Sequence, residues 1–310
     1  MKLLLTGAIQ YSNDQLKEIQ NLGFETVFVQ YENETLPLDI TLNVQGVICN
    51  SLFLKNDIQN FKNLKFIQAV SAGLDRLPMD YIQDRGISIK NAHGVYSIPM
   101  AEWALSQILS IYKSNYFFHT NQMDKVWEKK RDLKELNGQT AVIVGFGNVG
   151  QEIAKRLSSF GVNILATDIY DNAKELRNNF YHISELEIPL GMADIIVLAL
   201  PLTKETEHIF NKDMFSKVKK GAGLINISRG GVICETALID AISGDILSWV
   251  SLDVFTTEPL DTTSPLWDMK NVYLTPHNSF VSDKNKDRLF KLIIQNLKDA
   301  IKNEIFTNIP

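Results

Sequence analysis

Short apolar runs of strand length alternate along the chain with longer segments whose apolar residues recur at helical spacing. This alternation is typical of a parallel α/β fold. In the first part of the chain the pattern predicts strands at 2–6, 26–29, 46–50, 65–70 and 87–90, and a helix at 14–22. Turn residues bound each predicted strand, as expected for buried strands of a parallel sheet.

A second series of elements begins after a long helical segment at 98–119 and a charged segment at 125–134. It predicts strands at 140–144, 163–167, 195–200, 223–227, 248–253 and 271–274, followed by an amphipathic helix at 284–302. The restart near residue 98 predicts two α/β units, and 310 residues is a typical length for two domains. The pattern leaves open to which unit the last helix belongs.

Composition narrows the class of partner and the compartment. The net charge is −5 and no block of like charges occurs, which argues against nucleic acid or an anionic membrane as the main partner. The apolar runs at 1–7 and 195–202 are too short for a secretory signal or for the ~20 residues of a membrane span. Two cysteines, Cys49 and Cys234, make no disulfide framework. We therefore expect a cytoplasmic protein.

A glycine-rich turn gives the first chemical indication. The predicted strand at 140–144 runs into a G-x-G-x-x-G turn made by Gly145, Gly147 and Gly150, and a helical pattern follows. The first glycine permits the tight turn, the second lets a pyrophosphate approach the backbone, and the third lets the helix pack against the strand. Backbone amides at the helix start, including those of Asn148 and Val149, would face the anion. The turn predicts a dinucleotide-binding site.

The next strand supports this interpretation and indicates which dinucleotide binds. It ends in Asp168, at about the distance expected for an acidic residue that binds a ribose 2′-OH. The 2′-phosphate of NADP beside this carboxylate would cost on the order of 1–4 kcal/mol, and no arginine follows directly. We therefore expect NAD as the cofactor. An S-adenosylmethionine-dependent enzyme with a similar turn is the alternative.

Unusual polar residues follow three of the later strands. Arg229 lies in a glycine-flanked segment, Glu258 precedes a proline, and His277 follows one. Ligands of open α/β sheets bind outside the carboxyl ends of the strands, so these residues should border one crevice. Arg229 offers a planar fork for carboxylate and carbonyl oxygens, His277 can donate a proton near neutral pH, and Glu258 can hold the imidazole. Such groups can bind an anionic substrate and transfer a proton.

Other catalytic classes find no support in the chain. The remaining histidines show no metal-ligand spacing, and no Cys/His cluster suggests zinc (His93, His119, His182 and His208). A G-x-S-x-G nucleophile elbow is absent from the sequence. We expect no metal site.

Further segments lie in the same order as in a known family. They are Ser71-Ala72-Gly73-Leu74-Asp75, Asn91 through Ala101-Glu102, and Pro201-Leu202-Thr203 with Thr206. Together with Arg229, Glu258 and His277 they resemble the D-isomer-specific 2-hydroxyacid dehydrogenases over nearly the whole chain. The resemblance implies two Rossmann/flavodoxin-like doubly wound parallel-sheet domains, with the cofactor domain inserted into the substrate domain.

The resemblance also implies domain bounds, an activity and an assembly. Residues 1–97 plus 280–310 would form the substrate domain, and 98–279 the NAD-binding Rossmann domain. The activity would be reversible hydride transfer between NADH and a small 2-keto acid, giving a D-2-hydroxy acid. A homodimer would form through the cofactor domain and the long helix after Ile98.

Roles for single residues follow from the same resemblance. Arg229 and the backbone amides of Ala72 and Gly73 would bind the substrate, His277 would act as general acid and base, and Glu258 would support it. Further cofactor contacts would come from Ser97, Leu200, Pro201, Thr206, Ile227 and Asp253. The last of these would bind the nicotinamide carboxamide together with the carbonyl of Ile227, but it could instead cap a turn.

The sequence departs from the family pattern in two places. Cys234 stands where Asp or Asn is common, and Asn278-Ser279-Phe280 replaces the small residues usual after the histidine. Phe280 would reshape the substrate pocket, which Tyr96 and Met100 could also line. A non-catalytic NAD-sensing interaction protein of the same fold is the alternative function, but the intact Arg229, Glu258 and His277 favour an enzyme. Formate oxidation is disfavoured, because formate enzymes of the family carry Gln at the position of Glu258.

Overall fold

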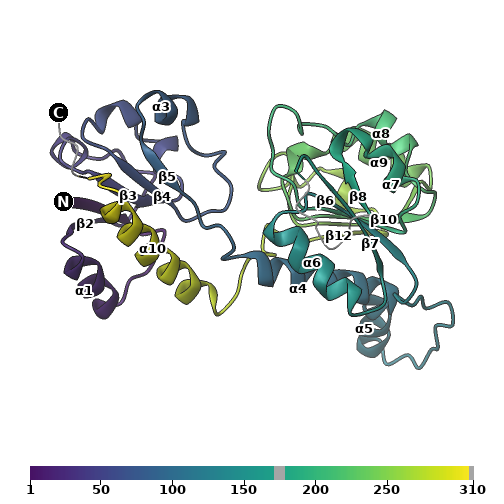
Figure 1. Ribbon diagram of the computed structural model, residues 1–310. Coiled ribbons are helices and arrows are strands. Elements are labelled where there is room, and N and C mark those ends of the chain that lie inside the picture. The colour runs from purple at the N-terminus through teal and green to yellow at the C-terminus, as the bar shows by residue number, and fades with distance from the viewer. Residues whose placement is uncertain (171–178, 307–310) are drawn as a thin grey trace. The chain divides into compact units, whose positions relative to one another are not determined.

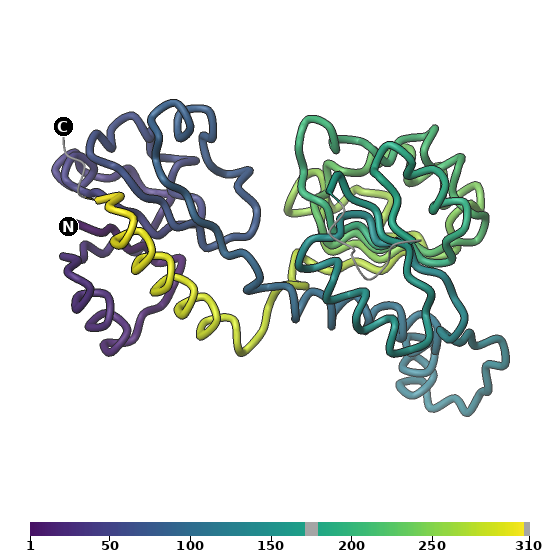
Figure 2. Tube along the Cα trace, in the orientation of Figure 1, coloured from purple at the N-terminus to yellow at the C-terminus, as the bar shows by residue number. Residues whose placement is uncertain are grey.

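The computed structural model describes residues 1–170 and 179–306, and the chain forms two compact units (Figure 1). The first unit comprises Met1–Tyr96 and Ser282–Pro310, and the second comprises Ser97–Val281. The chain thus leaves the first unit and returns to it, and its last helix lies beside the N-terminal strands (Figure 2). The parts of the expected domains at 171–178 and 307–310 lie outside the described residues.

The first unit is built on a parallel sheet of five strands in the order β2-β1-β3-β4-β5. The strands are β1 (Lys2–Thr6), β2 (Glu25–Val29), β3 (Gly46–Cys49), β4 (Phe66–Ala69) and β5 (Ser88–Lys90). Its helices are α1 (Asn13–Asn21), α2 (Leu38–Thr41), α3 (Met79–Asp84) and α10 (Asn285–Lys302). All five predicted strands are confirmed, and their order is that of flavodoxin-like folds.

Both faces of the central strands β1, β3 and β4 are buried, which explains why these strands are apolar without alternation. On one face Leu5 and Phe66 pack against the apolar stripe of α10, which includes Ile293 and Leu297. The opposite face packs against α3 and the connecting segments through side chains such as Val47. The last helix therefore belongs to the first unit, a point that periodicity left open.

The second unit is built on a parallel sheet of seven strands in the order β12-β11-β10-β9-β6-β7-β8. They are β6 (Thr140–Val144), β7 (Asn163–Asp168), β8 (Phe180–His182), β9 (Ile195–Leu198), β10 (Ala222–Asn226), β11 (Leu247–Leu252) and β12 (Val272–Leu274). The order reverses between β6 and β9, as in the Rossmann fold. The six predicted strands are confirmed at slightly different bounds, whereas the short β8 was not predicted.

Helices cover the second sheet on both faces (Figure 1). They are α4 (Ser97–Tyr112), α5 (Asn115–Met123), α6 (Asn148–Ser158), α7 (Glu187–Leu190), α8 (Lys212–Ser216) and α9 (Glu235–Ser243). Ile108 of α4 and Ile153 of α6 pack on Ile143 and Val197 of the sheet. The opposite face packs against α7, α8 and α9. The expected doubly wound architecture is thus confirmed.

The prediction of one helix over 98–119 is wrong. Helix α4 ends at Tyr112 and α5 begins at Asn115, because Ser114 has φ of +52°, a left-handed conformation that interrupts a right-handed helix. The ring of Tyr116 on α5 stacks on that of Tyr273 with centroids 4.9 Å apart. Tertiary packing therefore redirects the chain within a sequence that is continuous in its helical pattern.

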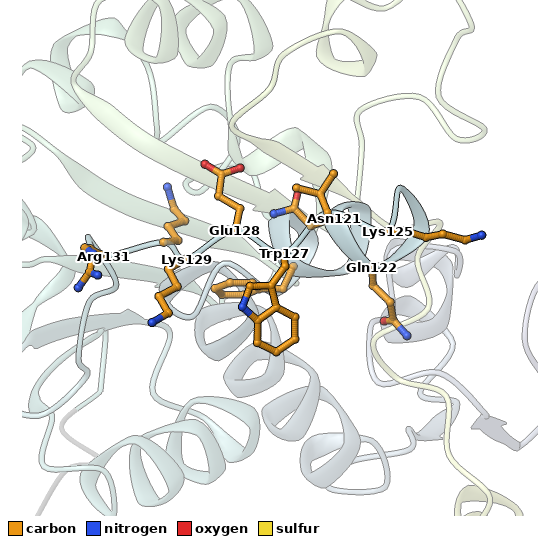
Figure 3. A pocket seen from close by; sticks show the side chains of 10 residues that line it. Asn121, Gln122, Lys125, Trp127, Glu128, Lys129 and Arg131 are labelled. Carbon is orange, nitrogen blue, oxygen red and sulfur yellow. The ribbon is translucent and has the colours of Figure 1, made fainter.

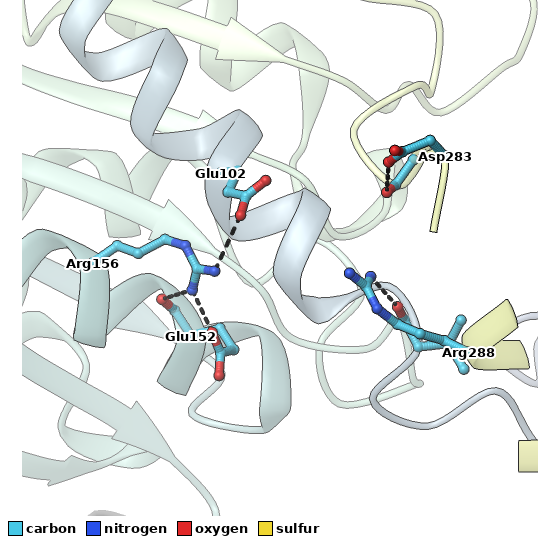
Figure 4. Close-up of polar contacts among 7 residues, drawn as sticks. Glu102, Glu152, Arg156, Asp283 and Arg288 are labelled. Carbon is cyan, nitrogen blue, oxygen red and sulfur yellow. Dashed lines mark hydrogen bonds and ion pairs between the residues drawn. The ribbon is translucent and has the colours of Figure 1, made fainter. Parts of the chain in front are cut away.

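Two arginines, one on α6 and one on α10, form polar contacts with neighbouring residues (Figure 4). Arg156 of α6 pairs with Glu152 on its own helix and with Glu102 of α4, the latter across 3.4 Å. Arg288 of α10 donates a hydrogen bond to the carbonyl oxygen of Val95. Exposed ion pairs contribute about 0–1 kcal/mol each, so apolar packing remains the main force that holds these helices.

A hydrogen bond between two side-chain amides contributes to holding α10 on the first sheet, and its loss can be measured. Gln68 on β4 is 0% exposed, and its Oε1 accepts a hydrogen bond of 2.7 Å from the Asn296 side chain. Asn296→Ala leaves this oxygen without a partner, which should lower the free energy of unfolding by about 1–3 kcal/mol. Urea denaturation measures the loss, with the neighbouring exposed Gln295→Ala as control. Equal stability of the two variants would contradict this role.

Candidate active site

The turn after β6 is built of glycines at which the backbones of neighbouring segments come too close for a side chain. Gly145 has φ of +95°, and a Cβ there would lie 2.6 Å from the backbone nitrogen of Leu200. A Cβ on Gly150 would lie 2.2 Å from the carbonyl oxygen of Gly145. The turn, the start of α6 and the segment after β9 therefore pack backbone against backbone, which only glycine permits.

Gly147, the middle glycine, lies in different surroundings. Among the described residues, nothing lies within 4 Å of a Cβ built there, and no side chain caps the first turn of α6, for which Gly147 is the N-terminal cap. The first N–H groups of a helix have no partner within it, so those of Asn148 and Val149 can bind an anion at the positive end of the helix dipole. The open space and the free donors fit a pyrophosphate group.

Asp168 is hydrogen-bonded to this turn. Its Oδ2 accepts a hydrogen bond of 2.7 Å from the backbone N–H of Phe146, inside the glycine motif, and its Oδ1 accepts one from Ile169. Strand β7 brings it there, because β7 pairs with β6 up to the last residue of β6. The carboxylate is half-buried, so it holds the turn and is still reachable by a ligand.

The segment after β9 closes into a small hydrogen-bonded turn. The Thr206 hydroxyl donates to the carbonyl oxygen of Pro201 and accepts from the N–H of Thr203, each at 2.7 Å. Leu200 at the start of this segment is buried against Gly145. The Thr206 turn therefore lies beside the glycine turn, at the point where the strand order reverses.

Arg229 follows β10 on a segment shaped by a buried asparagine. The Oδ1 atom of Asn226 accepts hydrogen bonds from the N–H and the hydroxyl of Ser228, while its Nδ2 donates to the carbonyl oxygen of Arg229. The guanidinium donates one hydrogen bond of 2.8 Å to the carbonyl oxygen of Ser228. Asn226 thus sets the backbone from which the Arg229 side chain extends.

Gly230 brings the Arg229 segment against the segment that carries Glu258. A Cβ on Gly230 would lie 1.9 Å from the carbonyl carbon of Phe255. The Oε1 atom of Glu258 accepts a hydrogen bond of 3.0 Å from the N–H of the same Phe255. Close backbone contact therefore places the two segments side by side at the carboxyl ends of β10 and β11.

His277 is paired with Glu258. The His277 Nδ1 lies 2.8 Å from Glu258 Oε2, and about a third of each side chain is exposed. The ring of Phe280 meets the imidazole at an interplanar angle of 89°, with centroids 5.9 Å apart. The backbone of His277 has φ of +50°, a left-handed conformation rare for a residue other than glycine. The imidazole is thus held from two sides on a constrained backbone.

Asp253 lies at the end of β11 and is 0% exposed. Its Oδ1 accepts hydrogen bonds from the Thr275 hydroxyl and the N–H of Asn278, and its Oδ2 accepts one from the N–H of Ser279. Hydrogen bonds to charged groups contribute about 1.5–3 kcal/mol each. The carboxylate therefore binds the loop that carries His277, which is the turn-capping role that the sequence left open.

The turn after β4 in the first unit presents backbone N–H groups. The Ser71 hydroxyl donates to the carbonyl oxygen of Gly73, and the Asn91 side chain donates to that of Ala72, so the turn is held through its carbonyl groups. Within 1–170 and 179–306, no acceptor faces the N–H groups of Ala72 and Gly73. Unpaired N–H groups at a turn can bind a carboxylate.

Most of the expected site residues thus lie at one edge of the second sheet: Gly145, Gly147, Asn148, Val149, Gly150, Asp168, Leu200, Pro201, Thr206, Ile227, Arg229, Asp253, Glu258 and His277. Ser97, the first residue of α4, is buried in the same unit. Ala72 and Gly73 belong to the first unit.

Sequence reasoning assigned no role to three residues that shape this edge: Asn226, Gly230 and Thr275. Each lies within two residues of a predicted site residue, and each is a polar or small residue shortly after a strand or at its end. Such positions are a usable signal, because loop backbones need partners there.

Several ionisable groups of the described residues have shifted pKa values, among them Tyr96 and Cys234. Burial raises the pKa of Tyr96, whose hydroxyl donates to the carbonyl oxygen of Val70. A hydrogen bond with the Thr236 hydroxyl lowers the pKa of the thiol of Cys234, the residue at the N-cap position of α9. The pattern in which Cys234 replaces Asp or Asn is therefore compatible with an ordinary helix start.

Within residues 1–170 and 179–306, no helix is long and apolar enough to cross a bilayer. Within the same ranges no three His, Cys, Asp or Glu side chains are grouped as metal ligands would be.

A groove of about 810 Å³ lies elsewhere on the second unit, along α5 and the segment after it (Figure 3). Lys125, Glu128, Lys129 and Arg131 line it together with Trp127, whose indole stands out from the segment. None of the residues around His277 contributes to it, so this groove is separate from the carboxyl edge of the sheet.

Comparison with known proteins agrees with this geometry. Residues 105–279 match the family model described as D-isomer specific 2-hydroxyacid dehydrogenase, NAD binding domain. The glyoxylate reductase of Thermofilum pendens is 36% identical over 251 residues, which cover 78% of this chain and 74% of that protein. The hydroxypyruvate reductase of Thermotoga maritima is 35% identical over 71% of this chain and 72% of its own.

A solved structure extends the likeness to both units. The D-isomer specific 2-hydroxyacid dehydrogenase family protein of Aeromonas salmonicida superposes with a TM-score of 0.82 at 27% identity, over 97% of this chain and 96% of that one. A Rossmann sheet with a glycine turn and a histidine–carboxylate pair at its carboxyl edge defines an NAD-binding oxidoreductase. The chain belongs to the D-isomer specific 2-hydroxyacid dehydrogenase family.

Gly230 and Gly147 form a matched pair for testing the close packing at this edge. Gly230→Ala places a Cβ 1.9 Å from the backbone of Phe255, whereas Gly147→Ala points into open space. Overpacking costs about 1–3 kcal/mol, so we expect Gly230→Ala alone to lower the free energy of unfolding. Thermal and urea unfolding of both variants measure it, and equal stabilities would show that the Arg229 and Glu258 segments do not depend on this contact.

Proposed function

We propose that this protein reduces small 2-keto acids to D-2-hydroxy acids with NADH, reversibly. The observation that carries the proposal is the His277–Glu258 pair at 2.8 Å, next to the Arg229 segment and on the same sheet edge as the open glycine turn. These are a proton donor, a cation for an anionic substrate and a place for a dinucleotide. Two relatives named as glyoxylate and hydroxypyruvate reductases support a small substrate.

The acid–base work falls to His277. With Nδ1–H donating to Glu258, the tautomer is set and Nε2 is left to face the substrate. Nε2–H would donate its proton to the oxygen that becomes the hydroxyl group, and in the reverse direction the neutral Nε2 would accept that proton. Glu258, held by the N–H of Phe255, would stabilise the imidazolium between these steps.

Substrate binding would use charge and free N–H groups. The planar guanidinium of Arg229 can grip the carboxylate and the keto oxygen of one substrate molecule. The unpaired N–H groups of Ala72 and Gly73 would receive the carboxylate. An anionic keto acid thereby gains donors whose positions the surrounding hydrogen bonds already hold.

The cofactor proposed is NAD, which supplies the hydride when it is bound as NADH. The donors at the start of α6 and the space beside Gly147 would hold its pyrophosphate, and Asp168 its ribose. A 2′-phosphate would meet the Asp168 carboxylate, which disfavours NADP. Further contacts would come from Ser97, Leu200, Pro201, Thr206, the carbonyl of Ile227, and the acceptor position left on Asp253 Oδ2.

We also propose a homodimer in the cytoplasm. The two cysteines are free thiols, as is usual in that compartment. The groove of Figure 3 belongs to a surface rich in exposed apolar side chains, among them a Trp127 that is 96% exposed. Tryptophan is enriched at protein interfaces. A second copy of the chain is the occupant proposed, and it would cover Tyr116, Phe118, Met123, Val126, Trp127 and Leu133.

The activity is tested by NADH oxidation at 340 nm with glyoxylate, pyruvate, hydroxypyruvate, and branched and aromatic 2-keto acids. His277→Ala should lower kcat by roughly 10²–10⁴ because the proton donor is lost, with little change in NADH affinity. Arg229→Ala should raise KM for the keto acid and lower kcat. NADPH runs in parallel and should give the higher KM.

Three outcomes would count against the proposal. NADH binding without turnover of any keto acid would favour the NAD-sensing protein instead. Loss of NADH affinity in His277→Ala would place His277 in the cofactor site. A lower KM for NADPH than for NADH would remove the role given to Asp168.

The assembly is tested by light scattering of the purified protein. The wild type should show twice the mass of one 35.1 kDa chain, and Trp127→Ala should shift the equilibrium toward the single chain because an interface anchor is lost. Tyr31→Ala, also at an exposed aromatic residue, serves as the control and should stay dimeric. A wild type that runs as a single chain at all concentrations would refute the dimer.

A further inference from the structure

The loop that carries His277 is held by one buried residue. Asp253 accepts three hydrogen bonds through its carboxylate, all from residues within 275–279. Its backbone carbonyl oxygen accepts a fourth, at 2.8 Å, from the N–H of His277 itself. The Asp253 backbone N–H donates to the carbonyl oxygen of Asn226 on β10. The loop is therefore anchored through Asp253 to the centre of the sheet edge.

This anchoring matters because His277 has an unfavourable backbone conformation. Its φ of +50° is one that side chains with a Cβ seldom adopt, so the surroundings must hold it there. Asp253 contacts the loop on both sides of His277, through the Thr275 hydroxyl before it and the N–H groups of Asn278 and Ser279 after it. These contacts fix the position of the His277 backbone, and that position decides whether Nδ1 reaches Glu258.

We propose that Thr275 and Asp253 are positioning residues for the reaction: the bond between the Thr275 hydroxyl and the Asp253 carboxylate holds the loop so that His277 meets Glu258. The inference rests on the proposed function, in which His277 is the acid and base. It adds a role for Thr275, and it gives Asp253 a task besides the cofactor contact. That task uses three acceptor positions of the carboxylate and leaves one on Oδ2.

Thr275→Val is the sharpest probe, because it replaces the hydroxyl by a methyl group of about the same volume. Asp253 and its two N–H partners stay in place. We expect kcat to fall about 10- to 100-fold, the range that a displacement of roughly 1 Å produces. The affinity for NADH, measured by fluorescence titration, should stay at the wild-type value. Thr275→Ser keeps the hydroxyl and should restore kcat.

Two further variants complete the experiment. Thr140→Val is the matched control, since Thr140 begins β6 of the same sheet and its hydroxyl makes no hydrogen bond within the described ranges. It should have wild-type kcat. The double variant Thr275→Val/His277→Ala should be no slower than His277→Ala alone, because a residue that acts through His277 has no effect once His277 is gone. NADH binding by each variant shows that it is folded.

The outcomes separate this inference from the proposed function. If His277→Ala lowers kcat and Thr275→Val does not, the positioning role is wrong and the function stands. If the double variant is slower than His277→Ala by the full factor of Thr275→Val, Thr275 acts elsewhere, which also overturns the inference. If His277→Ala keeps wild-type kcat, the proposed function itself fails. Should Thr275→Val not bind NADH, Thr275→Ser with reduced kcat would equally contradict the proposal.

Discussion

Hydrogen bonds from loop N–H groups to carboxylates at the carboxyl ends of the strands organise both units. Asp168 takes the N–H of Phe146, Glu258 that of Phe255, and Asp253 those of Asn278 and Ser279. In the first unit Glu32 likewise accepts the N–H groups following β3. Loops at this edge leave the ladder and need acceptors, and a carboxylate supplies several in one place. The rest of the site is built on loops held in this way.

These bonds also determine where an anion can bind. Several loop donors at the carboxyl edges are taken up by the chain's own carboxylates, and the negative charge of those carboxylates repels a ligand anion. Within residues 1–170 and 179–306, no side chain caps the N–H groups at the start of α6, and no acceptor faces those of Ala72 and Gly73. A pyrophosphate and a substrate carboxylate are the two anions that the proposed reaction must hold. The acidic residues thus keep ligand anions away from the loops they hold, and the unpaired N–H groups remain as the binding sites for an anion.

The sequence predicted what depends on local pattern. Strands buried on both faces are continuous apolar runs, so β1 and β6 could be recognised without any knowledge of their neighbours. The glycine turn could also be predicted from the sequence. The backbone contacts at 145 and 150 leave no room for a Cβ, so glycine is required at both positions. Arg229, Glu258 and His277 were predicted because each lies a few residues beyond an apolar strand and because together they match the family's pattern.

What the sequence did not predict depends on distant partners. Nothing local distinguishes Ser114 from its helical neighbours, and the break there accompanies the stacking of Tyr116 on Tyr273, far along the chain. The same holds for Thr275. Its role follows only from its hydrogen bond to Asp253, the residue after β11. The sequence predicted Asp253 as a cofactor contact and left a turn cap as the alternative, and three hydrogen bonds from the His277 loop show that the carboxylate does cap this turn. A buried carboxylate needs hydrogen-bond partners. The partners of Asp253 therefore identify the loop that the fold keeps in one position.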